Sequence, residues 1–260
     1  MERSFLVENE MYANTVDPLQ MLYLHEGFYT CPKGANGERL GPLVGYAGTY
    51  DAKNGTQNHW VGDVYVNFAK AEEYPKILCN FAYSLRAVIE PLIDTTSVFC
   101  GTPIGGYSFS QILGMVYDRR VIKAEKKVVA PTPVESIVGA REQSSLIFAR
   151  HEIKPGENVV IVEDVCNNFS TTEELITLIE KSDAVVVGII CLLNRSLAVD
   201  AIYASHEKEI PVVSLVRLPI RQYKQDDQEV AQDIAMGNVV WKPKNEWPRL
   251  MEAMKNAQKA

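Results

Sequence analysis

The segment that most constrains this chain is an apolar run followed by two acids, a polar turn and the start of a helix. Residues 158–162 are apolar and rich in β-branched side chains, as expected of a strand buried on both faces of a parallel sheet. Glu163 and Asp164 follow where this strand should end, and a helix is expected to begin at Thr171. Because ligands of open α/β sheets bind beyond the carboxyl ends of the strands, the segment is a candidate binding site.

The polar turn, residues 166–170, adds a second chemical feature to the acids. A turn that leads into a helix N-terminus offers main-chain N–H groups to an anion such as phosphate. Two carboxylates beside such a turn suit a sugar with vicinal hydroxyls, a magnesium ion, or both. The plainer alternative is a strand whose end happens to be acidic. The spacing alone leaves both interpretations open, because strand–acid–turn–helix arrangements are common.

Composition limits the class of protein. With 260 residues, 47% of them hydrophobic, the chain can form one large domain or a domain with a subdomain. A net charge of −7 argues against a broad nucleic-acid or anionic-membrane surface. The chain has no run of about 18 apolar residues, no signal-peptide profile at its start and no paired C-x-x-C spacing. We therefore predict a cytoplasmic protein with reduced thiols that binds neither nucleic acid nor membrane.

The order of predicted elements indicates an α/β fold, a mainly parallel sheet flanked by helices. Residues 1–70 are expected to form a small N-terminal cap, and residues 71–260 the α/β core with the C-terminal helices. The long connection at 130–157 is of a kind that often serves as a lid. Predicted strands cover 46–50, 64–68, 97–100, 120–129, 158–162, 184–193 and 212–216. Predicted helices cover 18–25, 72–92, 106–117, 171–181, 197–208, 227–236 and 246–259.

The central segment resembles the phosphoribosyl-diphosphate motif of the type I phosphoribosyltransferases. That motif is an apolar strand, two acids, two apolar residues and a Thr/Gly/Ser-rich turn before a helix, and residues 160–166 follow it closely. The turn departs from the motif, since Asn167, Asn168 and Phe169 stand where the family favours Thr, a small residue and Gly. Phe is poorly suited to the left-handed conformation that Gly and Asn tolerate. Three hydroxyl side chains remain at the helix start: Ser170, Thr171 and Thr172.

Two more segments resemble the orotate phosphoribosyltransferases and precede the central motif in the family's order. Gly101, Thr102 and Pro103 lie in a Gly-rich strand-to-helix turn that resembles the family's pyrophosphate loop, although such turns are often merely tight. Residues 123–127 resemble the Arg-Lys-Glu-x-Lys segment before the family's catalytic loop. Lys123 replaces its first Arg, and Lys127 matches the lysine that reaches diphosphate.

The family's loop His is missing after this segment, where the chain continues with Val128, Val129 and Ala130. Its loss would remove one cationic donor to the departing pyrophosphate. Arg141 or His151 would be the candidates to compensate for it.

The base-binding residues come from two other places. Residues 192–195 resemble a Leu-Asp-Arg segment whose Arg pairs with the carboxylate of the base, with Asn194 in place of the Asp. In the predicted cap, Lys53 begins a segment that resembles the family's Lys-Ser-Gly. Tyr65 lies in one that resembles Tyr-Phe-Phe-Asn, where an aromatic ring can stack on a base. Plainer roles are a solvated strand end for Arg195 and a core position for Tyr65.

The resemblance implies a type I phosphoribosyltransferase-like fold and an orotate phosphoribosyltransferase. Such an enzyme transfers a phosphoribosyl group from phosphoribosyl diphosphate to orotate and releases pyrophosphate. Lys127, Glu163 and Asp164 would be catalytic, Mg²⁺ would be the cofactor with no residue assigned as its ligand, and the assembly would be a homodimer. The implied substrate-binding residues are Lys53, Tyr65, Gly101, Thr102, Pro103, Lys123, Asn167, Asn168, Ser170, Thr171 and Arg195.

Two alternatives stay open. One is a regulatory protein that senses phosphoribosyl diphosphate or a nucleotide without turnover, which the Asn-Asn-Phe turn favours. The other is a phosphoribosyltransferase for another base. Retention of Lys127 and Arg195 favours the orotate enzyme.

Overall fold

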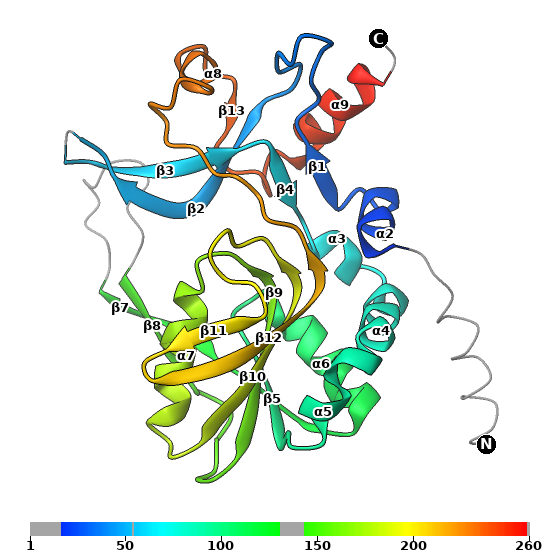
Figure 1. The fold of residues 1–260 in the computed structure, drawn as a ribbon, viewed down its shortest axis with the longest axis vertical. Helices are drawn as coiled ribbons and strands as arrows, with labels where there is room; N and C mark the ends of the chain where they lie inside the picture. The colour runs from blue at the N-terminus through cyan, green and yellow to red at the C-terminus, as the bar shows by residue number, and fades with distance from the viewer. Residues whose placement is uncertain (1–16, 54, 131–142, 259–260) are drawn as a thin grey trace. The chain divides into compact units, whose positions relative to one another are not determined.

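The chain forms two compact units (Figure 1). The described part of unit 1 lies within residues 74–218, and that of unit 2 lies within residues 16–73 and 219–260. The computed structural model describes residues 17–53, 55–130 and 143–258.

A six-stranded sheet forms the centre of unit 1, in the order β11-β12-β10-β9-β5-β6. Its strands are β5 (Val98–Gly101), β6 (Arg120–Lys123), β9 (Asn158–Cys166), β10 (Val185–Asn194), β11 (Ile202–Ser205) and β12 (Lys208–Arg217). All pairs are parallel except the edge pair β11–β12. The predicted α/β fold with a mainly parallel sheet is therefore confirmed. The acid-bearing strand β9 lies between β10 and β5, where both of its edges are hydrogen-bonded.

Helices cover both faces of this sheet (Figure 1). On one face, Leu175 and Ile176 of α7 (Ser170–Glu180) pack in the main core with Ile161 of β9. On the other face, α6 (Gly106–Tyr117) lies against β5 and β9, and α4 (Pro75–Ser84) packs on α6. The predicted helix at 72–92 is divided between α4 and α5 (Arg86–Ile93). This arrangement leaves the carboxyl ends of β5 and β9 beside the N-termini of α6 and α7.

The predicted helix at 197–208 is wrong. This segment contains β11, which is followed by a turn at His206 and Glu207. β11 pairs antiparallel with the start of β12. Pairing with β12 satisfies the main chain of this segment, and Tyr203 packs against the main core.

The predicted strand at 120–129 is broken at Ala124. Its first half, β6, joins the main sheet, and its second half, β7 (Glu125–Ala130), pairs with β8 (Gln143–Ile147) in a separate two-stranded ribbon. Part of the predicted lid, residues 131–142, lies outside the described residues.

Unit 2 is assembled from both ends of the chain. Strand β2 (Leu43–Asp51) pairs with β3 (Gln57–Gly62) on one side and with β13 (Val239–Val240) on the other. Trp247, Leu250 and Met251 of α9 (Trp247–Ala257) share a core with Tyr29 and Val44. The C-terminal segment therefore folds with the N-terminal region, whereas the sequence prediction had grouped it with the α/β core. The remaining elements are α2 (Pro18–Leu24), β1 (Phe28–Thr30), β4 (Val64–Val66), α3 (Ala69–Glu72) and α8 (Ala231–Ala235).

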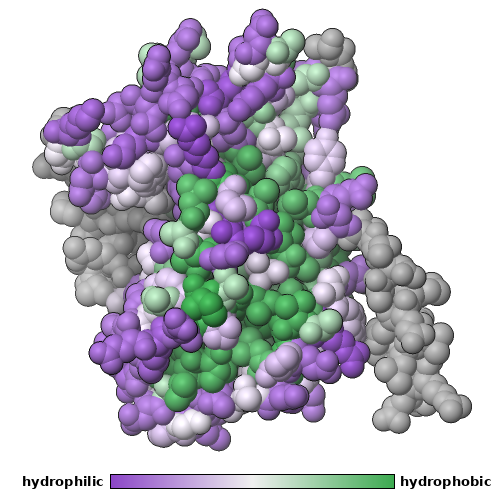
Figure 2. Space-filling view, viewed as in Figure 1, coloured by the Kyte–Doolittle hydropathy of each residue, from purple (hydrophilic) through white to green (hydrophobic). Residues whose placement is uncertain are grey.

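Apolar side chains gather on one visible face of unit 1, over β10 and β12 (Figure 2). Half-buried Val213 and Leu215 belong to this part of β12. Among the described residues, every helix is too short or too polar to span a bilayer.

Candidate functional site

The two acids lie within the last four residues of β9, which runs four residues further than the sequence predicted. Glu163 is paired with Cys191 of β10, while β5 ends opposite Val162. β9 continues for four residues beyond the end of β5. Glu163 and Asp164 therefore lie where the β9 edge that faces β5 is no longer paired. The acids therefore border the loop that leaves β5, at the carboxyl end of the sheet, where ligands of such folds bind.

Glu163 has an electrostatically costly position. Its Oε2 atom is buried and has no hydrogen-bond partner among the described residues. Burial raises the pKa of this carboxyl well above its ordinary value, and the adjacent carboxylate of Asp164 raises it further. A buried oxygen without a partner is suited to a hydroxyl group or a cation supplied by a ligand.

The loop after β5 packs directly against both acids. The Thr102 N–H and Oγ1 donate to the main-chain oxygen of Val162 at 3.0 Å and 3.1 Å. A Cβ on Gly106 would lie 2.0 Å from the same oxygen, and a Cβ on Gly105 would lie 2.2 Å from Cγ of Asp164. At Gly106 the clash would be with main-chain atoms, and at Gly105 the carboxylate of Asp164 would have to move. The predicted pyrophosphate loop therefore approaches the acid-bearing end of β9 closely. Within this loop the peptide bond between Pro103 and Ile104 is cis.

Sequence reasoning placed Gly105 in the loop but gave it no role in the site. Its signal was the Gly-Gly pair directly before the helix. The structure shows that this glycine leaves room for the carboxylate of Asp164, which also accepts the Val165 N–H at 2.8 Å.

The turn after β9 adopts the left-handed conformation that sequence reasoning considered difficult for Phe. Phe169 has φ 57° and ψ 15°. Its ring is 3% exposed and stacks on Tyr203, with the centroids 4.7 Å apart and the planes at 13°. The backbone conformation costs on the order of 1–3 kcal/mol, and ring burial with stacking offsets it. The ring therefore lies in the core and does not occupy the turn.

The polar residues of the turn remain at the helix start. The Asn168 Oδ1 accepts hydrogen bonds from the Ser170 N–H at 3.3 Å and from its hydroxyl at 3.1 Å. The first N–H groups of α7 have no acceptor within the helix, and the helix dipole makes this end attractive to an anion. The turn at 167–169 thus follows β9 directly, with two residues between it and Asp164, and leads into a helix N-terminus of the kind that can bind an anion.

The two predicted lysines occupy different settings. Lys123 is paired with Gly101 in the main sheet, and its Nζ lies 5.3 Å from the centroid of the Tyr107 ring. Lys127 is exposed on the β7–β8 ribbon, opposite Ser145, and within the described residues it forms no ion pair. The structure thus brings Lys123 to the loop after β5 and leaves Lys127 on the ribbon.

Of the two residues suggested as replacements for the missing loop His, the structure describes only His151. Arg141 lies outside the described residues. The Nδ1 atom of His151 is buried and has no hydrogen-bond partner among the described residues.

Arg195 begins the loop after β10, next to the end of β9. Its N–H donates to the main-chain oxygen of Cys166 at 2.9 Å, and the residue is 9% exposed. The preceding Asn194 is fully buried, and its amide donates to the oxygens of Val199 and Asp200 at 3.1 Å and 3.0 Å. Asn194 therefore shapes the loop that carries Arg195, a role that sequence reasoning missed.

The predicted base-binding residues of the cap belong to unit 2. Lys53 is exposed and lies 3.5 Å from Asp226. Tyr65 is half-buried against Trp247, with ring centroids 6.1 Å apart, and it borders the core of unit 2. The plainer core interpretation of Tyr65 therefore describes its position within this unit.

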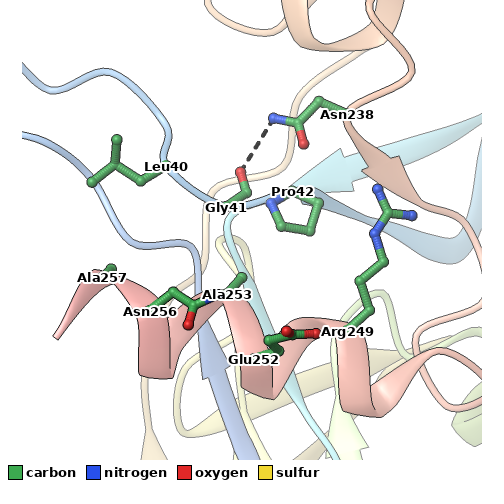
Figure 3. Close-up of a pocket in the computed structure, with 9 residues that line it drawn as sticks. All are labelled: Leu40, Gly41, Pro42, Asn238, Arg249, Glu252, Ala253, Asn256 and Ala257. Carbon is green, nitrogen blue, oxygen red and sulfur yellow. Dashed lines mark hydrogen bonds between the residues drawn. The ribbon is translucent and has the colours of Figure 1, made fainter. Parts of the chain in front are cut away.

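A separate cavity of about 490 Å³ lies in unit 2 (Figure 3). None of the residues predicted from the sequence lines it. Asn238 donates to the main-chain oxygen of Gly41 at 3.3 Å beside it, and Arg249 and Glu252 of α9 contribute charged groups. Its lining consists of Leu40, Gly41, Pro42, Asn238, Arg249, Glu252, Ala253, Asn256 and Ala257.

Comparison with known proteins points to one class. An orotate phosphoribosyltransferase of a Thermoanaerobacter species is 27% identical over 166 residues, which is 64% of this chain and 75% of that protein. An adenine phosphoribosyltransferase of Caldicellulosiruptor bescii is 28% identical over 117 residues, 44% of this chain and 67% of that protein. The solved orotate phosphoribosyltransferase of Aeropyrum pernix is 13% identical, with a TM-score of 0.47, covering 84% of this chain and 98% of that one. No family model matches the chain.

The sequence relatives of this chain are phosphoribosyltransferases, a class of glycosyltransferase, and the resemblance predicted from its motifs is confirmed. Orotate and adenine enzymes both occur among them, so the comparisons support the transferase class and leave the base to be argued from the site.

Proposed function

We propose that this protein transfers a phosphoribosyl group from phosphoribosyl diphosphate to orotate, with release of pyrophosphate. The observation that carries the proposal is the contact between the 101–106 loop and the acid pair, beside the N-terminus of α7. This arrangement offers sites for a diphosphate, a ribose and a 5′-phosphate along one edge of a sheet. No other cluster in the described residues combines these three features.

The acids suit the ribose. Glu163 and Asp164 would accept hydrogen bonds from its two hydroxyls, and this would satisfy the buried Oε2 of Glu163. Glu163 holds a proton in the ligand-free protein, but a cation or positive charge that develops on the ring would favour its ionised form. The negative charge of the pair would then stabilise that positive charge as the bond to pyrophosphate breaks. The N–H groups of the 170–172 helix start would bind the 5′-phosphate, with the hydroxyls of Ser170 and Thr171.

The departing pyrophosphate needs positive charge. Thr102 and its neighbours in the loop would hold it, Lys123 lies at the base of the same loop, and Lys127 would approach it from the β7–β8 ribbon. The residues fit Mg²⁺, since the cation commonly binds one or two carboxylates together with substrate phosphates. When bound, Mg²⁺ would neutralise charge on the diphosphate. No group of three or more His, Cys, Asp or Glu residues that could hold a metal occurs in the described residues.

Arg195 supports orotate as the base. Its main-chain N–H donates to Cys166, so the residue follows β10 beside the end of β9. A guanidinium group can pair with a carboxylate through two parallel hydrogen bonds. Orotate has such a carboxylate and adenine does not. The homodimer implied by the resemblance has support in the apolar surface over β10 and β12 (Figure 2).

The experiment is a turnover assay of the full chain with phosphoribosyl diphosphate, Mg²⁺ and either orotate or adenine. Orotate consumption is followed by absorbance, and pyrophosphate release is measured for both bases. We expect pyrophosphate release only with orotate. Release only with adenine would assign another base and reject the role of Arg195.

A sensor without turnover is the second candidate, and the turn at 167–169 favours it because it lacks the family's glycine. Saturable binding of phosphoribosyl diphosphate, with no pyrophosphate release from either base, would support the sensor.

A further inference from the structure

The edge strand β11 contacts the phosphate-binding turn through an aromatic stack. Tyr203 lies on β11, and Phe169 ends the turn immediately before α7. Their rings are nearly parallel, 4.7 Å apart at an angle of 13°. Phe169 is the residue with the left-handed backbone, so this stack holds the one residue of the turn whose conformation is intrinsically unfavourable.

A second contact links the same strand to the first turn of α7. The Tyr203 hydroxyl donates to Oε2 of Glu173 at 2.7 Å, and the Ser205 hydroxyl donates to Oε1 at 2.9 Å. The Nε2 of His206 lies 3.5 Å from the same Oε1. Burial raises the pKa of Tyr203, and its bond to Glu173 raises it further, so the phenol remains a donor at neutral pH.

The carboxylate of Glu173 lies in the part of the helix where an anion is attracted. In the first turn of α7 it is favoured by the helix dipole and would compete with a phosphate for the same positive end. Its bonds to Tyr203 and Ser205 direct both of its oxygens toward β11. Tyr203 thus contacts both Phe169, which has the unfavourable backbone conformation, and the carboxylate of Glu173, which would compete with a phosphate.

We infer that Tyr203 is a positioning residue that keeps the unusual 167–170 turn open for the 5′-phosphate. Its ring holds Phe169 and its hydroxyl holds Glu173. This inference rests on the proposed function for its ligand, but the bracing of the turn can be measured without any ligand. Residues 197–208 thereby acquire a role that their predicted helix would not have provided.

Two variants of Tyr203 separate the two contacts. Tyr203→Phe retains the ring and removes the hydroxyl, and Tyr203→Leu removes both. Tyr117→Phe is the control for removal of a tyrosine hydroxyl. The Tyr117 hydroxyl donates within unit 1 to the main-chain oxygen of Ala82 on α4, at 3.0 Å and away from the turn.

Hydrogen exchange of the ligand-free proteins tests the brace. We expect Tyr203→Leu to accelerate exchange of the hydrogen-bonded Ser170 and Glu173 amides by at least about tenfold relative to amides of β9, and Tyr117→Phe to leave them unchanged. Equal exchange in Tyr203→Leu and in the parent would overturn the inference, whether or not the protein binds phosphoribosyl diphosphate.

Calorimetric titration with phosphoribosyl diphosphate and Mg²⁺ tests the consequence. We expect Tyr203→Phe to weaken binding on the order of fivefold, and we expect this loss to disappear in a Glu173→Gln background, where the competing charge is absent. The same loss in both backgrounds would show that Tyr203 does not act through Glu173 and would reject that part of the inference. A parent protein that binds no phosphoribosyl diphosphate would instead reject the proposed function, while the exchange result stands.

Discussion

Glu163 is a buried acid whose ionisation lowers the stability of the ligand-free protein. Its pKa is raised in the folded protein, mainly by burial and then by Asp164, so the native state holds a proton that the unfolded chain releases. The stability that this proton provides is complete below the ordinary pKa of glutamate and is lost as pH rises through the raised value. An acid kept in such a position is typical of a functional site.

We expect Glu163→Gln to stabilise the ligand-free protein increasingly as pH rises, because glutamine cannot ionise. Urea unfolding of both proteins between about pH 5 and pH 9 measures the difference in unfolding free energy. Glu152→Gln, at an exposed position of the same unit, is the control. A stability difference between Glu163→Gln and the parent that does not grow with pH would show that the buried carboxyl does not titrate as described.

Lys127 is expected to act on the transition state. It is exposed on the ribbon, so its removal should not disturb the core. We predict that Lys127→Ala lowers kcat by roughly a hundredfold, while the KM for phosphoribosyl diphosphate changes much less. Lys126→Ala provides the control, since Lys126 is the exposed neighbouring residue of the same strand. Comparable kcat values in Lys127→Ala and in the parent would remove Lys127 from the chemistry.

At the scale of elements, the close approach of the 101–106 loop to β9 depends on the missing side chain of Gly106. A Cβ at Gly106 would meet main-chain atoms of Val162, which have no room to move within a paired strand. We expect Gly106→Ala to lower the unfolding free energy by about 1–3 kcal/mol and to weaken binding of phosphoribosyl diphosphate. Thermal unfolding and titration measure the two effects.

Gly48→Ala is the control for this substitution, because its Cβ would have its nearest neighbour, the Cδ1 of Trp60, at 3.7 Å. Its stability should stay within about 0.5 kcal/mol of the parent. Equal behaviour of the Gly106 and Gly48 variants would mean that the loop does not require its close approach to the acids.

Local patterns predicted most of unit 1, and contacts between distant segments explain the exceptions. The predicted 106–117 helix matches α6, and the acids fall at the carboxyl end of a central parallel strand. The 197–208 helix failed because pairing with β12 overrides local spacing. The conformation of Phe169 depends on Tyr203, which lies 34 positions further along the chain, so inspection of the turn alone did not reveal it.

At the scale of the molecule, an ion-pair network joins the two chain ends in unit 2. Arg39 Nε lies 2.6 Å from Asp63, and Arg39 Nη1 lies 3.0 Å from Asp233. Burial opposes ionisation of Asp63, but hydrogen bonds from Arg39 and Lys33 outweigh it and lower its pKa. The stability that this carboxylate provides is therefore present above the ordinary pKa of aspartate and is lost as pH falls through the lowered value.

We expect Asp63→Asn to lower the unfolding free energy by about 2 kcal/mol near neutral pH, because it leaves the largely buried Arg39 partly unpaired. The difference from the parent should shrink in acid, where Asp63 becomes protonated in both states. Urea unfolding at a series of pH values measures this. A difference that stays constant down to about pH 2 would contradict the role of the network.

The most direct test of the account is thermal unfolding of the full chain during titration with phosphoribosyl diphosphate in the presence of Mg²⁺. Ligand that binds only the native state should raise the melting temperature steadily with concentration. At about 100 times the dissociation constant, the added stability should be roughly 2.7 kcal/mol. Asp164→Asn, which removes one acid of the pair, should show a much smaller rise. A melting temperature that stays flat in the parent across the whole titration would contradict the claim that this site binds phosphoribosyl diphosphate.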